Sequence, residues 1–239
     1  MTVCLVRRES RTDQSSRPDP HSADLDRMTD FEQLAARQAV LGRVRLAEQQ
    51  AALLGPAGVL ARLSRQVREQ GRQAPAFEDL KSLIDRKRQA LAEQAVQFVL
   101  GALCRRPPSD NPFDHCSREA LCCMVFDDTA HYTLVERYTA ADALKRSDSA
   151  FFAKLIATTR NTVERRIVFH GLLEHFDRLL PIEKSIYPLD YRAVQQAHLD
   201  HEEALYGKLE LEEPISRTLE TREPQWLLEH LTGLQHAVG

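Results

Sequence analysis

The chain has 239 residues, of which 43% are hydrophobic and 28% are charged, and its formal net charge is -3. With 9 Gly and 11 Pro it is neither collagen-like nor of low complexity, and no apolar run approaches the roughly 20 residues of a membrane-spanning helix. The composition therefore argues against a fibrous protein, a protein with helical membrane spans and a uniformly basic coat for nucleic acid.

The start of the chain does not match an export signal, because Arg7 and Arg8 interrupt the apolar residues before a hydrophobic core can develop. Residues 7–27 are mostly Arg, Ser, Asp, Pro and Gln and offer little to bury, so we predict a disordered tail over 1–28. Five cysteines are an odd number and favour reduced thiols in a cytoplasmic protein over a disulfide framework.

Residues 29–104 are predicted to form a basic helical region. In its first helix, over 30–54, apolar residues alternate at spacings of four and three, as in a coiled coil. Such a seam would pair with a second helix in the same molecule or in another copy of the chain. The seam residues are Val40, Val44, Ala47, Ala51 and Leu54.

Two more helices are predicted in this region. Residues 57–71 place Leu60, Leu63 and Val67 inward and arginines outward. Residues 76–104 end in Ala-Val-Gln-Phe-Val-Leu-Gly-Ala-Leu, which is apolar nearly all round. That end should therefore lie deep in the core.

Residues 105–112, Arg-Arg-Pro-Pro-Ser-Asp-Asn-Pro, form the clearest linker. Beyond it, the segments 119–126 and 132–138 are interpreted as helices, although their β-branched and aromatic residues would also suit strands. A long helix is expected over 150–180, capped by Ser147-Asp148-Ser149, and another over 189–211.

The predicted fold class is therefore all-α. An antiparallel helical bundle over 113–239 follows the basic helical region and the disordered tail, and two short helices end the chain.

Charge is distributed unevenly along the chain. Residues 31–90 hold 11 basic and 6 acidic side chains, whereas residues 189–230 hold 4 and 10. The two ends could lie against each other, form separate solvated faces, or offer a basic surface to a partner. Guanidinium groups suit bidentate contacts with carboxylates or phosphates. The candidate partner-binding residues are Arg62, Arg65, Arg68, Arg86, Lys87 and Arg88.

Two histidine–glutamate sets occupy corresponding positions on the two long helices of the second half. On a wheel of 100° per residue, each set continues the apolar stripe of its helix, which includes Ile167 on the first helix and Val194 and Leu205 on the second. The candidate metal ligands are His170 and Glu174 on the first helix and His198, His201 and Glu202 on the second.

The short connection from Pro181 to Pro188 predicts that these helices are antiparallel neighbours. His170 and His198 would then lie level, roughly 15 Å and 13.5 Å from the turn at a rise of about 1.5 Å per residue. Imidazole and carboxylate groups are ligands for iron, zinc or manganese. Two interpretations stay open, a structural His–Glu network and a metal site.

The stretch His198-Leu-Asp-His201-Glu202-Glu203 resembles the H-x-x-x-E-E helix of hemerythrin-type bundles, and Glu174-His175-Phe-Asp-Arg-Leu-Leu180 is similar to their first helix. The resemblance implies an iron site between helices. That family also uses a later H-x-x-x-H helix and an H-x-x-x-x-D helix, and neither follows Glu202 in this sequence, so two ligand sets of a two-iron site are missing.

No phosphate-binding loop, nucleophile elbow, C-x-x-C or G-x-G-x-x-G motif occurs in the sequence. We therefore predict a cytoplasmic, non-enzymatic interaction or regulatory protein that docks a macromolecular partner, with a protein favoured. Two alternatives remain, a bundle that binds iron, zinc or manganese, and a nucleic-acid-binding protein that uses the basic helices within 37–88.

Overall fold

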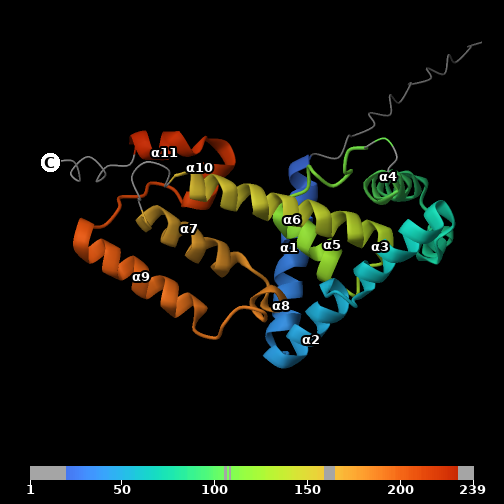
Figure 1. Ribbon diagram of the computed structural model, residues 1–239, viewed down its shortest axis with the longest axis horizontal. Helices are drawn as coiled ribbons and strands as arrows, with labels where there is room; N and C mark the ends of the chain where they lie inside the picture. The colour runs from blue at the N-terminus through green and yellow to red at the C-terminus, as the bar shows by residue number, and fades with distance from the viewer. Residues whose placement is uncertain (1–19, 105–106, 108, 159–164, 231–239) are drawn as a thin grey trace, which may run out of the picture.

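The computed structural model describes residues 20–104, 107, 109–158 and 165–230, and within them every regular element is helical (Figure 1). This confirms the all-α prediction, including the helical interpretation of the two ambiguous segments. The α-helices are α1 Pro20–Ala39, α2 Arg43–Leu54, α3 Val59–Gln70, α4 Arg86–Leu103, α5 Arg118–Phe126, α6 Leu134–Ala157, α7 Arg165–Arg178, α8 Pro181–Lys184, α9 Tyr191–Tyr206, α10 Ile215–Thr221 and α11 Pro224–His230. Two 3-10 helices, η1 Gly71–Gln73 and η2 Pro75–Ser82, connect α3 to α4.

Side-chain caps explain where several helices begin. The Ser117 hydroxyl accepts the N–H of Ala120 at the start of α5. Thr133 and Glu136 form a reciprocal capping box at the start of α6, in which each side chain accepts the other residue's backbone N–H. Each cap satisfies backbone donors that the first helical turn would otherwise leave unpaired.

The predicted helix over 30–54 is divided at Gly42, which has extended backbone angles before α2. Because of this break, the seam residues no longer share one helix face, and Val40 and Val44 are exposed. At its other end, α1 extends to Pro20, about ten residues before the expected start. The rest of the predicted disordered tail, residues 1–19, lies outside the described residues.

The expected helix over 150–180 is also wrong in its limits. The capping box starts α6 at Leu134, so Ser147-Asp148-Ser149 lies inside this helix instead of before it. Asp148 accepts hydrogen bonds from Arg118 and does not cap a helix. The helix ends at Ala157, and the chain resumes in α7 at Arg165.

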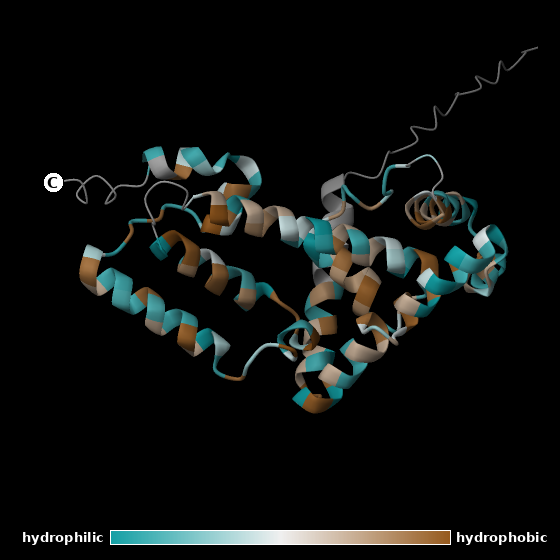
Figure 2. Ribbon diagram, in the orientation of Figure 1, coloured by the Kyte–Doolittle hydropathy of each residue, from teal (hydrophilic) through white to brown (hydrophobic). Residues whose placement is uncertain are grey.

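The described residues form two hydrophobic cores. The first lies among α1 to α6 and includes the end of α4, where Ala95, Val96 and Leu100 are fully buried as predicted. Figure 2 shows hydrophobic residues along α5, near the centre of the molecule. The second, smaller core joins the end of α6 to α7, α10 and α11, with Leu155 and Ile167 buried within it. Helix α6 therefore contributes to both cores.

The predicted linker does not separate these cores. Val99 before it and Phe113 after it pack in the same first core. No helix within the described ranges is long and apolar enough to cross a membrane.

Candidate functional site

Helices α7 and α9 lie side by side and run in opposite directions, as the short connection between them predicts (Figure 1). His170 faces α9, and its Nε2 lies 3.4 Å from Oε1 of Glu203. The glutamate that approaches this histidine is thus the neighbour of the predicted Glu202.

The other predicted metal ligands are directed to different places. Both carboxylate oxygens of Glu174 accept backbone N–H groups at the start of α10, at 2.9 and 2.7 Å. Glu202 is buried and accepts a 3.3 Å hydrogen bond from Arg165. His198 and His201 are exposed. Among the described residues, no group of three or more His, Cys, Asp or Glu side chains is arranged to hold a metal ion.

The orientation of α9 explains why these residues do not converge. The apolar stripe with Val194 and Leu205 is expected on the inner face, yet these two side chains are 40% and 60% exposed. The face that packs on α7 instead contains Leu199 and Glu202, the two buried residues of α9. Periodicity identified a stripe correctly but could not tell which side α7 would cover.

The arginines of α3 point outward, as predicted, while the opposite face is buried in the first core. The guanidinium of Arg62 donates to the carbonyl of Ala57 at 2.8 Å, and that of Arg65 donates to the carbonyl of Pro56 at 3.2 Å. These bonds hold two arginines in place but leave further N–H donors for a ligand.

The three basic residues at the start of α4 differ from one another. Arg86 and Lys87 are exposed, whereas Arg88 donates to the carbonyl of His131 and lies 3.4 Å from Glu136. Of the predicted partner-binding residues, Arg88 is the one that forms an ion pair within the described part of the chain. The others form none there, namely Arg62, Arg65, Arg68, Arg86 and Lys87.

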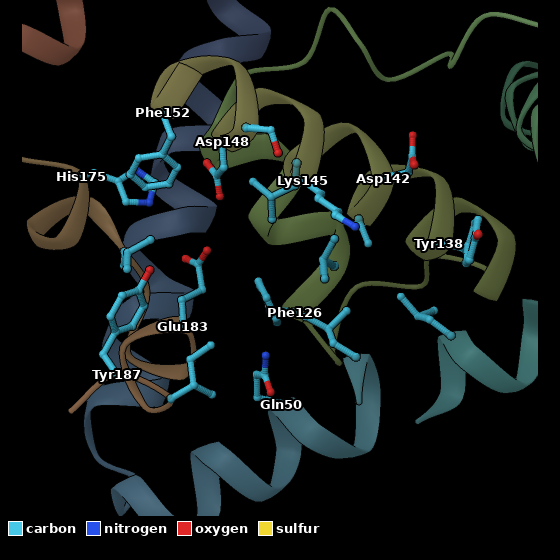
Figure 3. Close-up of a pocket in the computed structure, with 18 residues that line it drawn as sticks. Gln50, Phe126, Tyr138, Asp142, Lys145, Asp148, Phe152, His175, Glu183 and Tyr187 are labelled. Carbon is cyan, nitrogen blue, oxygen red and sulfur yellow. The ribbon is translucent and has the colours of Figure 1, made fainter. Parts of the chain in front are cut away.

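A groove of about 570 Å³ lies beside α6 (Figure 3). Helix α6 forms one wall from Tyr138 to Phe152, and α2 and α8 lie across from it. We call this hollow the α6 groove. Its volume falls within the range typical of ligand sites. Sequence patterns could not find it, because it combines segments that are distant along the chain.

The inner surface of the α6 groove is apolar. Val125, Phe126 and Leu144 are buried beneath it, and Leu54 and Ile186 form a partly exposed rim. An apolar hollow with an exposed apolar rim is typical of a surface that a ligand or partner covers.

One end of the α6 groove is polar. The guanidinium of Arg118 donates to Asp148 at 2.9 and 3.2 Å and to Glu183 at 2.6 and 3.4 Å. Glu183 also accepts the N–H of Leu180 at the start of α8. Arg118 therefore connects α5, α6 and α8 through a single guanidinium group.

His175 lies beside this polar end, stacked on Phe151 with ring centroids 5.5 Å apart. Burial lowers its pKa, and the positive charge of Arg118 acts in the same direction, while Asp148 and Glu183 oppose the change. Burial and Arg118 thus disfavour the protonated form of this imidazole.

Two adjacent cysteines of α5, Cys122 and Cys123, are buried. Burial and the Glu183 carboxylate raise the pKa of Cys122, whose thiol lies 3.7 Å from that carboxylate. Burial raises the pKa of Cys123 to about 11. Both shifts disfavour the thiolate, which is the form a nucleophilic or metal-binding cysteine requires.

The basic helices α3 and α4 and the acidic helices α9 and α11 lie at opposite ends of the molecule, with α1 and α2 between them (Figure 1). The charge asymmetry of the sequence therefore does not reflect contact between the two ends.

No family model, curated protein or solved structure matches this chain.

Proposed function

We propose that this chain is a non-enzymatic interaction protein that docks an amphipathic helix of a protein partner in the α6 groove. The observation that carries the proposal is the length and lining of that groove. From Tyr138 to Phe152 it follows α6 for roughly 21 Å at about 1.5 Å per residue, which corresponds to four helical turns. Grooves of this kind accept the apolar face of a helix through anchors at i, i+3, i+4 and i+7.

The charges along the α6 groove favour an acidic partner helix. Asp142 is paired with Arg146, and Asp148 and Glu183 are paired with Arg118. Lys145 is exposed on the groove side of α6 and has no acidic partner among the described residues (Figure 3). A carboxylate beside the apolar stripe of the partner would satisfy this ammonium group.

The arginines of α3 form a second basic surface outside the groove. Leu60 of α3 lines the groove, whereas Arg62, Arg65 and Arg68 lie on the exposed face of that helix and do not line it. Because Arg62 and Arg65 are already held by backbone carbonyls, ordering them on a partner carries a smaller entropy cost. Arginine is also enriched at the centres of protein interfaces.

The thiols are consistent with a cytoplasmic, non-catalytic protein. Cys122 and Cys123 are buried and form no disulfide, and burial moves the pKa of each away from reactivity.

Site-specific photo-crosslinking in cells that naturally produce the chain tests the proposal. A photoreactive residue is placed at Leu54 or Ile186 on the groove rim and, as a control, at Ile84, which is 94% exposed and does not line the groove. We expect both rim positions, but not the control, to crosslink to one acidic amphipathic segment of a partner. Adding Ile186→Asp should abolish the crosslink from position 54 without changing the melting temperature.

Equal crosslinking from all three positions would contradict docking in the α6 groove. Crosslinks to nucleic acid, with binding that weakens steeply as salt increases, would support the basic helices as a nucleic-acid surface instead.

A further inference from the structure

The exposed face of α9 carries no charged side chain of its own, although Arg165 of α7 and Glu202 line a hollow together with its residues His198, His201 and Leu205. All side chains of this face are exposed. They are Ala193, Val194, Ala197, His198, His201, Ala204 and Leu205. The charged residues of this helix, Arg192, Asp200, Glu202 and Glu203, lie elsewhere on its circumference. Helix faces that remain in water normally carry charged residues, so this face has the character of a contact surface.

Four residues of this face form a narrow stripe. Val194, His198, His201 and Leu205 follow one another at spacings of four, three and four residues. At about 100° per residue they fall within about 60° of the helix circumference. This is the spacing of a helix-pairing seam, here with two histidines at its centre.

The order of the stripe is self-complementary. A two-fold axis through the midpoint between His198 and His201 would place Val194 of one copy opposite Leu205 of a second copy. The same axis would place His198 opposite His201 of the second copy. Two-fold dimers use one surface patch twice in this way, which makes a second copy of the chain the occupant that fits the stripe.

The two imidazoles of one chain are neighbours on α9, with Cβ atoms about 5–6 Å apart, as is general for residues three positions apart in a helix. The ring of His198 is held by stacking on Phe169, with centroids 5.3 Å apart. Two antiparallel copies would bring four imidazoles to the axis. Four neutral nitrogen ligands suit tetrahedral Zn²⁺, and one chain alone supplies only two of them.

Charge indicates why such a pairing would require a cation. Residues 189–230 hold 10 acidic and 4 basic side chains, so two such ends repel each other. A divalent ion at the axis offsets that repulsion as it joins the helices. We propose that a zinc-class ion bound by His198 and His201 of two chains joins two copies of this protein through α9. This inference does not involve the α6 groove.

The test uses the untagged full-length chain, because a polyhistidine tag would itself bind metal. Molar mass is measured by light scattering after size exclusion, with Zn²⁺ or with EDTA. We expect a monomer in EDTA and a dimer with one zinc per two chains in Zn²⁺. His198→Ala and His201→Ala should each remain monomeric with zinc. His115→Ala, which removes an exposed imidazole outside α9, should still dimerise.

Two outcomes would overturn the inference. One is zinc bound at one ion per chain without dimerisation. The other is a dimer that persists in both α9 variants, which would assign the contact to another surface.

The geometry is tested separately with cobalt and with introduced cysteines. Co²⁺ in place of zinc should give the intense visible absorption of a tetrahedral site, and this absorption should be lost in His201→Ala. After oxidation, Val194→Cys mixed with Leu205→Cys should form linked pairs of the two variants, whereas each variant alone should not. Equal linkage within the single variants would refute the antiparallel register.

Discussion

Replacing Arg118 by Met removes the one cation that holds two carboxylates at the polar end of the α6 groove. The side chains of Arg118, Asp148 and Glu183 are only 12%, 26% and 11% exposed. Met keeps most of the apolar stem, so the loss arises from the carboxylates left without a counter-charge rather than from a large cavity.

Breaking a buried ion pair by removing one partner costs about 3–5 kcal/mol. Because water reaches Asp148 in part, the lower end applies, and we expect the free energy of unfolding to fall by about 3 kcal/mol. For a chain of this length, that corresponds to a decrease of about 6–12 °C in melting temperature.

Urea unfolding followed by circular dichroism measures this loss directly. The matched control is Arg118→Met combined with Asp148→Asn and Glu183→Gln, which removes the stranded charges and should recover at least half of the lost stability. A single Arg118→Met variant within 1 kcal/mol of the parent would refute this account, as would a triple variant no more stable than the single one.

Three further predictions concern the second half of the chain. Because burial lowers the folded-state pKa of His175, the unfolded chain binds a proton more readily, so stability should fall as pH drops below about 6.5. The urea midpoint should decrease less over this range in His175→Asn than in the parent protein, and equal decreases in the two proteins would contradict this. In Gly171→Ala the new Cβ would lie 2.6 Å from a methyl group of Leu155, so we expect a net loss of about 1 kcal/mol despite better helix propensity, and a Leu155→Ala background should reduce that loss. Glu174→Ala leaves the first N–H groups of α10 unpaired, so hydrogen exchange should accelerate over Ile215–Thr221 but not in α3, and uniform acceleration would indicate global destabilisation instead.

Local chemistry was predictable where it depends on neighbouring residues. Ser117 caps α5, and Leu63 and Val67 face inward opposite outward arginines. The end of α4 buries Val96, Val99 and Leu100, although Gln97 and Ala102 stay exposed. Each of these features follows from periodicity or from a cap within a few residues. The antiparallel contact of α7 with α9 followed from the short connection alone.

Features that depend on distant segments were not predictable in this way. The wheel for α9 found the stripe of Val194, His198 and Leu205, but only the position of α7 decides that it faces outward. Likewise, Arg118 meets Glu183 across 65 residues. The prediction of metal ligands was limited in the same way, because equal distances from the turn along two helices do not imply that the side chains face each other.

Residues on both sides of the 105–112 segment pack in the first core, which matters for where the chain can be cut. The exposed residues Pro107, Ser109 and Asp110 mark a place where the backbone could be cut or extended with little loss of packing. Because Val99 and Phe113 pack in the same interior, the two pieces of a chain nicked there should stay associated, whereas either piece expressed alone would carry an uncovered apolar surface. A reporter inserted at this point is therefore a better probe of the intact protein than a truncation that ends there.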